Sequence, residues 1–394
     1  TPTPAPAPLI PCLHTLVFFL CRTDGTLTTH TIHISVSPDL PHPAGMVSSF
    51  TKGFNSTIFA YGQTGSGKTW TMFGDVNSIP NEGIVSRACR QVLEYAEKAK
   101  GDGMTCIVKA AMIEIYNEQI NDLLNYKEGK NLPLREDATQ GVYIPNLKEM
   151  TISSVEDLIK CINKGFASRA TSSTKMNDQS SRSHCLVQIR LEQKKADGSS
   201  DVTKNSKLNL VDLAGSEKVK KTGAKGAALK EAQNINTSLS ALGKIIRMLS
   251  DKQMKQTEKD KKEGAGGEEK SAADEKKKKS RRKGSNQEKQ QHIPYRDSKL
   301  TRMLQNSLGG NTKTMLLVAC SPHDDNFDET MSTLKFAARA RMISNITSVN
   351  ATSTNMEGFK ATGTTVAELT EQLKVGSKLS VSACRLCCCC CCCF

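Results

Sequence analysis

Short apolar runs alternate with amphipathic stretches from about residue 53 to residue 344. Apolar runs bounded by turn residues predict buried strands, and apolar positions that recur with a helical period predict helices. Strands that alternate with helices favour an α/β fold, in which a sheet carries helices on both faces. The expected strands are 55–62, Cys106–Asn117, Cys185–Gln193, Lys207–Leu213 and Thr314–Cys320, and the expected helices begin at Lys68 and span 154–164 and 227–249.

The pattern breaks at three places. Residues 1–43 are rich in Pro and Thr, and only His30–Ser37 alternates like a strand. Residues 251–291 hold 14 Lys and Arg against nine Asp and Glu, a composition that cannot bury a core and predicts a disordered insertion. Residues 345–394 are rich in Thr, Ser and Asn, with one helical candidate at 366–374. We therefore expect a main domain at 44–344, interrupted at 251–291, between an atypical N-terminal segment and a low-complexity tail.

Charge narrows the class of partner. The 394 residues include 54 Lys and Arg against 40 Asp and Glu, a formal net charge of +14. This surplus favours nucleic acid, an anionic membrane or an acidic protein surface, although basic enzymes without a polyanionic ligand are also common. No apolar run approaches the roughly 18 residues that span a bilayer. The best run, Thr15–Cys21, follows a segment without Lys or Arg, which disfavours a secretory signal.

Cysteine usage indicates a reducing compartment. Eight of the 15 cysteines lie in the last eleven residues, as Cys384 and the run Cys387–Cys393, and the others are scattered without CxxC spacing. Scattered cysteines in a chain of this length favour the cytoplasm over a disulfide framework or a zinc site. Adjacent cysteines cannot all converge on one ion. The run is interpreted as a read-through or gene-model artefact, with a palmitoylated or metal-scavenging tail as the alternative.

A glycine-rich segment at the end of the 55–62 strand predicts a nucleotide site. The residues Gly62, Gln63, Thr64, Gly65, Ser66, Gly67, Lys68 and Thr69 match the pattern GxxxxGK[ST] between a strand and a helix. In this pattern backbone N–H groups and the helix N-terminus hold phosphates, Lys68 reaches the β and γ oxygens, and Thr69 binds Mg²⁺. The alternative, a glycine-rich turn without a ligand, does not account for the flanking strand and helix.

Hydrolysis also requires groups that sense the terminal phosphate and order the attacking water. Asp212–Glu217 follows an apolar strand, where an acidic residue near Mg²⁺ is expected, and Gly215 could offer its N–H to a γ-phosphate. Asn177–His184 is a polar loop of hydroxyls and one arginine. Taken separately, each segment is equally well read as an ordinary solvated turn.

Together these segments resemble the kinesin motor family. FAYGQTGSGKTWTM resembles the family's P-loop, MNDQSSRSH its switch I and LVDLAGSE its switch II. EIYNEQINDLL, ALKEAQNINTSLSALGKII, HIPYRDSKLTRMLQNSLGGN and STLKFAARARMISN also resemble kinesin segments, in family order. The resemblance covers about residues 44–350 apart from 251–291. It implies a P-loop NTPase-like fold with a mixed, mostly parallel central sheet, and an ATP-hydrolysing, microtubule-stimulated motor of the cytoplasmic cytoskeleton.

The resemblance also implies roles for individual residues. Ser181 would meet Mg²⁺ or its water together with Thr69 and Asp212, and Ser180 would lie beside the γ-phosphate. Arg182 and Glu217 would form the ion pair that closes the two switches, Glu217 would accept a proton through a water relay, and Asn236 would support that water. The alternative for Arg182 and Glu217 is a surface ion pair that contributes little.

Tubulin presents an acidic surface, so basic residues that flank the insertion are the candidates for the microtubule contact. They are Lys244, Arg247, His292, Arg296, Lys299 and Arg302. The insertion lies where the family places a lysine-rich loop, and its surplus of five positive charges predicts salt-dependent tethering. A solvated spacer with no binding role stays open as the alternative.

The chain departs from the family's pattern before the P-loop. Only 61 residues precede Gly62, and none forms the RxRP-like motif that lies against adenine in kinesins. Either the first strand is missing or misread, or the pocket lacks its adenine wall. Trp70 could stack on the base or pack in the core. Thr237 stands where the family more often has a basic residue.

Ala337–Asn350 resembles the neck linker of plus-end-directed kinesins, and no long heptad array supports a dimer. Two rival functions stay open. A P-loop ATPase that acts on nucleic acid would explain the charge, but aromatic residues are only 5% and no stacking set is evident. A microtubule-binding relic that has lost turnover would explain the unusual N-terminus.

Overall fold

The computed structural model describes residues 13–23, 26–30, 43–137, 141–172, 181–198, 202–217, 227–264 and 292–353. The chain divides into two compact units, residues 1–352 and 353–394, and the site described below belongs to the first. Most of the predicted insertion and tail therefore lies outside the described residues.

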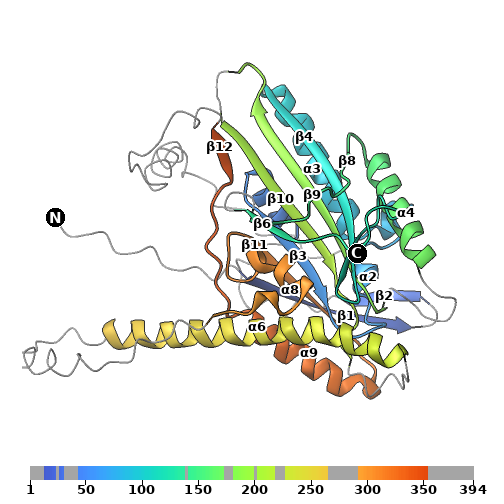
Figure 1. Cartoon of the computed structure of the whole chain (residues 1–394), viewed down its shortest axis with the longest axis vertical. Helices are drawn as coiled ribbons and strands as arrows, with labels where there is room; N and C mark the ends of the chain where they lie inside the picture. The colour runs from blue at the N-terminus through green and yellow to red at the C-terminus, as the bar shows by residue number, and fades with distance from the viewer. Residues whose placement is uncertain are drawn as a thin grey trace, which may run out of the picture. The chain divides into compact units, whose positions relative to one another are not determined.

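A ten-stranded sheet runs through the first unit (Figure 1). Its main path is β2-β1-β11-β3-β10-β9-β4-β5, with β8 paired to β4 and β12 paired to β10. The neighbours β1, β11, β3 and β10 pair in parallel, whereas β9, β4 and β5 continue the sheet in antiparallel pairs. The strands are β1 Leu13–Thr23, β2 Thr26–His30, β3 Ser56–Tyr61, β4 Met104–Tyr116, β5 Gln119–Asp122, β8 Met150–Thr151, β9 His184–Lys195, β10 Val202–Asp212, β11 Lys313–Cys320 and β12 Ala351–Ser353. A separate pair, β6 Arg135–Asp137 and β7 Gly141–Tyr143, forms a small second sheet.

The N-terminal segment differs from the sequence-based expectation. The strand pattern pointed to His30–Ser37, of which only His30 lies within the described residues. The described residues form strands at 13–23 and 26–30, because the apolar run around Thr15–Cys21 has the β-branched and aromatic residues that suit a pleated surface. β1 pairs with β11 from Leu13↔Thr314 to Phe19↔Cys320, and β2 returns along β1. The first unit thus has a hairpin at this edge of the sheet, and the missing or misread first strand of the family stays a prediction.

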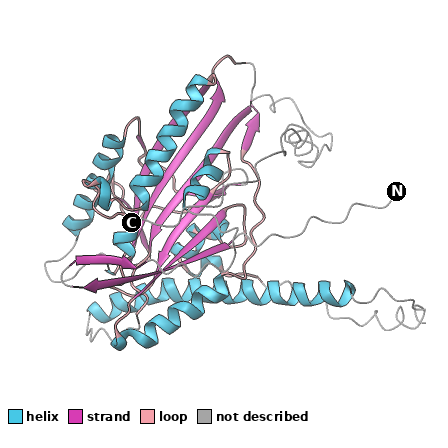
Figure 2. Cartoon of the chain, turned by 180° about the vertical axis from the view of Figure 1, so that it is seen from behind, coloured by secondary structure: helices cyan, strands magenta, loops and turns pink. Residues whose placement is uncertain are grey.

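Helices cover both faces of the sheet, as expected for this α/β fold (Figure 2). Alternate side chains of the central strands enter two cores: Ile58 of β3 packs with one helix layer and Phe59 with the other. Both faces are buried, so the central strands read as continuous apolar runs. The first layer holds α1 Pro43–Thr51, α2 Lys68–Met72, α3 Ile84–Gly101 and α4 Val155–Ser172, and the second holds α6 Ala227–Gly264, α8 Lys299–Met303 and α9 Phe327–Ala340. Short 3₁₀ turns lie at Ile79–Asn81, Tyr295–Asp297, Gln305–Ser307 and Asp324–Asn326.

Helix α6 extends beyond its predicted end. The sequence pattern ends the helix at Leu249 and predicts disorder from Asp251, whereas α6 continues to Gly264 (Figure 1), and residues 251–259 are exposed apart from the half-buried Gln253. Lys, Gln and Glu dominate this extension, and each is a good helix former. Adding turns to an existing helix avoids the cost of nucleation, so helix can form here without a core to bury.

Candidate functional site

The glycine-rich loop joins β3 to α2 at the carboxyl end of the parallel strands, where α/β sheets bind ligands. Gly65 and Gly67 have φ values of 78° and 89°, a left-handed backbone that glycine adopts without strain. A side chain at Gly62 would place its Cβ only 2.0 Å from the carbonyl oxygen of Ala319 in β11. The glycines are therefore required by backbone shape and by close strand packing, in addition to any phosphate contact.

Lys68 opens α2 and is buried beneath this loop, with 6% of its surface exposed. Its Nζ donates to the carbonyl oxygen of Gln63 at 2.8 Å, and the Ser66 hydroxyl donates to the same oxygen at 2.7 Å. Burial lowers the pKa of the Lys68 ammonium, while the carboxylates of Asp212 and Glu217 oppose that shift. A buried cation that the protein only partly compensates is suited to binding an anionic phosphate.

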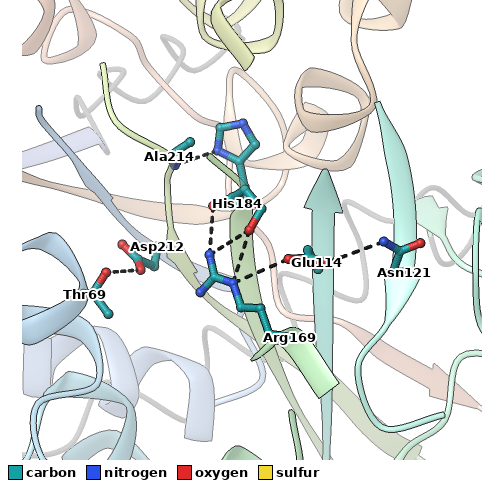
Figure 3. A network of polar contacts seen from close by, with 8 residues as sticks. Thr69, Glu114, Asn121, Arg169, His184, Asp212 and Ala214 are labelled. Atoms are coloured by element: carbon teal, nitrogen blue, oxygen red, sulfur yellow. Dashed lines mark hydrogen bonds and ion pairs between the residues drawn. The ribbon is translucent and has the colours of Figure 1, made fainter. Parts of the chain in front are cut away.

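Thr69 of α2 contacts Asp212, the last residue of β10. The Thr69 hydroxyl donates to Oδ2 of Asp212 at 2.6 Å (Figure 3). Asp212 is 1% exposed, and burial raises its pKa against the opposing effects of Thr69, Lys68 and Arg169. Its other oxygen, Oδ1, is buried and has no hydrogen-bond partner among the described residues. A hydroxyl beside a buried carboxylate with an open oxygen suits Mg²⁺, which prefers oxygen ligands.

The segment after Asp212 lies across the glycine-rich loop. Glu217 accepts hydrogen bonds from the backbone N–H of Thr64 at 2.8 Å and from its hydroxyl at 2.6 Å. The N–H of Ser216 donates to the carbonyl oxygen of Gly62 at 3.1 Å. These hydrogen bonds hold the segment after Asp212 against the P-loop.

Two residues with predicted roles, Gly215 and Glu217, make other contacts in this structure. The N–H of Gly215, expected to face a γ-phosphate, donates to the carbonyl oxygen of Ser181 at 3.0 Å. The loops that carry Ser181 and Gly215 therefore touch directly. Glu217 contacts Thr64, so its pairing with Arg182 stays a prediction.

Other predicted residues are only partly described. Ser180 lies outside the described residues, and Asn236 lies in α6 but its side chain is not described. Ser181 is described and lies against Gly215. Trp70 is 36% exposed, which does not fit the core role and leaves base stacking as a prediction.

A buried polar network that the sequence reading did not assign lies behind these loops (Figure 3). Arg169 of α4 donates through Nη2 to the hydroxyl of Ser183 at 2.8 Å and to its carbonyl oxygen at 3.0 Å. Its Nε lies 3.5 Å from Oε1 of Glu114, whose Oε2 accepts from Asn121 at 3.4 Å. A charged residue in an otherwise apolar strand, Glu114 within AAMIEIY, was the available sequence signal.

His184 completes the network. Its Nδ1 accepts from the N–H of Ala214 at 2.9 Å, and its Nε2 lies 2.8 Å from the Ser238 hydroxyl of α6. Burial lowers the pKa of His184 to about 3, and the positive charges of Arg169 and Lys68 act in the same direction. The ring is therefore neutral near pH 7, and it bridges the nucleotide loops and α6.

The six basic candidates for polymer contact lie on α6, on α8 and in the turn before α8. Lys244, Arg247, His292 and Arg296 are exposed, while Lys299 and Arg302 are half-buried. Nζ of Lys244 lies 2.9 Å from Asp297, and Arg296 lies 3.7 Å from Glu136. These surface pairs are weak and leave the side chains available to an acidic partner.

The segment that resembles a neck linker lies along the core. The buried Asn345 side chain donates to the carbonyl oxygens of Ser307 at 3.0 Å and Thr312 at 2.6 Å, and it accepts from the N–H of Gly309 at 2.7 Å. Further along, the N–H of Asn350 donates to the carbonyl oxygen of Gly53 at 2.9 Å. The segment from residue 345 to 350 is thus in a docked arrangement.

Comparison with known proteins relates this chain to kinesins. The family model described as the kinesin motor domain matches residues 41–343. The chain is 45% identical over 303 residues to kinesin-related protein 5 of Dictyostelium discoideum, covering 76% of this chain and 27% of that protein. It is 42% identical over 307 residues to the kinesin heavy chain of Syncephalastrum racemosum, covering 78% of this chain and 29% of that protein. The chain thus spans less than a third of the length of these relatives.

Solved structures agree with these sequence relatives. The structure of a fast kinesin superposes with a TM-score of 0.64 at 39% identity, over 81% of this chain and 80% of that one. A KIF14 dimer in its two-heads-bound state with AMP-PNP, in complex with a microtubule, superposes with a TM-score of 0.63 at 33% identity, over 84% of this chain and 80% of that one. Among the helices that the structure describes, none combines the length and apolarity needed to cross a bilayer.

Proposed function

Because this chain belongs to the kinesin motor domain family, we propose that it is an ATP-driven microtubule motor, in which hydrolysis of a Mg²⁺-bound ATP is coupled to binding and movement along the polymer. One observation carries the proposal most directly. Thr69 in α2 and Asp212 at the end of β10 share a 2.6 Å hydrogen bond beside the buried Lys68. Microtubules are the partner in the similar KIF14 complex, and the family's association with microtubules supports a cytoskeletal location in the cytoplasm.

The protein groups have separate tasks in this proposal. Lys68 and the N–H groups of the glycine-rich loop bind the phosphates, and Thr69 with Asp212 would hold Mg²⁺ or its water. When bound, Mg²⁺ neutralises charge that develops on the phosphoryl oxygens. Glu217 would release Thr64, pair with Arg182 and accept a proton through water. In this structure Glu217 accepts from the N–H and the hydroxyl of Thr64.

Lys68→Ala tests the phosphate site. We expect the substitution to abolish binding of a fluorescent ATP analogue in a titration, because it removes the only lysine among the residues of the glycine-rich loop. Lys207→Ala is the matched control: burial lowers the pKa of the half-buried Lys207 as it does that of Lys68, but Lys207 lies five residues before Asp212 in β10. Retained affinity in Lys68→Ala would refute the phosphate-site assignment.

Stimulation of the ATPase distinguishes the proposal from its rivals. We expect microtubules to accelerate phosphate release by the unmodified chain, whereas duplex and single-stranded DNA should not. Stimulation by DNA alone would indicate an ATPase that acts on nucleic acid. Microtubule binding that is insensitive to nucleotide and releases no phosphate would indicate a relic without turnover.

A further inference from the structure

One buried imidazole joins the nucleotide loops to α6. His184 is the first residue of β9, which runs antiparallel to β10 and pairs Cys185 with Asp212. The start of β9 therefore lies beside the end of β10, next to the segment that begins after Asp212. From this position the 3% exposed ring of His184 reaches Ala214 on one side and Ser238 on the other.

The direction of both hydrogen bonds is fixed by chemistry. A backbone N–H can only donate, so Nδ1 of His184 must accept from Ala214. In a neutral imidazole the proton then resides on Nε2, which donates to the Ser238 hydroxyl at 2.8 Å. If the segment after Asp212 moved without the ring, Nδ1 of His184 would lose its donor and stay buried without a hydrogen bond. If the ring rotated with the segment, the bond from Nε2 to Ser238 of α6 would change.

The main chain that carries the imidazole is held from the opposite side. Arg169 binds both the hydroxyl and the carbonyl oxygen of Ser183, the residue directly before His184, and it faces Glu114 within the sheet (Figure 3). These groups are almost fully buried, with side-chain exposures of 6% for Arg169 and 0% for Glu114. The backbone at the start of β9 is thus held in place. The two partners of the His184 ring, Ala214 and Ser238, belong instead to the segment after Asp212 and to α6.

We propose that His184 is a positioning residue that couples the 214–217 segment to α6 through Ser238, and so links the state of the nucleotide site to the polymer-binding helix. The inference rests on the proposed motor function. Lys244 follows Ser238 by six residues, or about 9 Å along a helix, so a shift at Ser238 is carried rigidly to the exposed basic surface. Coupling between the nucleotide site and α6 requires a physical connection whose geometry depends on the state of both sites. The two hydrogen bonds of His184 supply such a connection.

Ser238→Ala tests the connection with the smallest change. It removes the hydroxyl that contacts His184 and leaves the bond from Ala214 in place. Ser250→Ala is the matched control, because Ser250 is equally buried in α6 but its hydroxyl bonds only to the helix's own Arg247 carbonyl among its described contacts. Both variants should keep the basal ATPase rate and the melting temperature close to those of the unmodified chain.

The two variants should differ in the coupling between ATP hydrolysis and microtubule binding. Microtubule stimulation should fall by about 3- to 10-fold in Ser238→Ala, the range that corresponds to one net hydrogen bond, and should be unchanged in Ser250→Ala. Because coupling is reciprocal for binding, the ratio of microtubule affinities measured with an ATP analogue and with ADP should fall by a similar factor. A residue with only a structural role would lower stability and both rates together.

A second variant approaches the same bond from the other side. His184→Asn keeps an acceptor for Ala214 and loses the contact with Ser238, so the double variant His184→Asn/Ser238→Ala should be no less coupled than either single variant. Additive losses, or a Ser238→Ala protein with the same stimulation as Ser250→Ala, would overturn the inference. If the unmodified chain shows no stimulation by microtubules, the motor proposal itself fails, and that outcome is distinct from loss of coupling in a working motor.

Discussion

The buried pair of Arg169 and Glu114 gives the largest stability change that we predict. Glu114→Gln preserves the shape of the side chain and an acceptor for Asn121, but it removes the negative charge opposite a guanidinium whose side chain is 6% exposed. The cation then keeps its hydrogen bonds to both oxygens of Ser183 but loses the carboxylate beside its Nε. Breaking one partner of a buried pair costs about 3–5 kcal/mol, because the remaining charge stays buried without compensation.

Calorimetric unfolding with a matched pair measures this cost. Arg190 and Glu149 form a comparable contact at 3.0 Å, but their side chains are 41% and 21% exposed. Glu149→Gln should therefore cost at most about 1 kcal/mol. We expect Glu114→Gln to lower the melting temperature by about 5 °C or more, and Glu149→Gln to lower it by a small fraction of that. Equal shifts in the two variants would show that burial does not set the strength of the Arg169 contact.

Three further changes probe other parts of the molecule. Asn345→Ala should speed hydrogen exchange across residues 345–350, because it removes the side chain that holds this segment to neighbouring backbone groups; unchanged exchange would contradict the docked arrangement. Glu118→Ala should lower stability by about 1 kcal/mol in thermal unfolding, since the Glu118 carboxylate accepts from the N–H of Lys299 at the start of α8; no change would contradict that capping role. His184 stays neutral down to a pKa of about 3, whereas its unfolded counterpart gains a proton below 6.5. Stability should consequently fall by about 2 kcal/mol from this group between pH 7.5 and 5, and His184→Asn should remove that part of the pH dependence measured by denaturant titration.

The central strands could be predicted from sequence because both of their faces are buried. β4 was expected at Cys106–Asn117 and lies at Met104–Tyr116, and β11 differs from its expected bounds by a single residue. The N-terminal hairpin and the extension of α6 could not be predicted in the same way. β1 is held by pairing with β11, 301 residues away, and the α6 extension depends on helix propagation where composition alone suggested disorder.

The phosphate-binding part of the site could be predicted because its residues are contiguous and each has a backbone or chemical reason for its place. The buried network could not, since it joins Glu114, Arg169 and Ser183 through contacts that depend on strand register and on the rotation of α4. His184 stood inside a recognised segment but received no role. Its importance depends on Ser238, which is 54 residues away and reaches the ring only in the folded chain.

The mixed pairing of the sheet explains why the coupling residue lies where it does. In a wholly parallel sheet every strand would end at the edge that holds the nucleotide site. Only loops that follow strands would then meet at that edge. Reversal between β10 and β9 makes one chain segment enter the sheet at the edge where another leaves it, with Cys185 opposite Asp212. The loop that ends at Ser183 and the loop that begins after Asp212 are therefore neighbours through strand pairing alone. A side chain at the first position of the entering strand, His184, can contact both the leaving loop and the helix above it while its own backbone is fixed by the sheet.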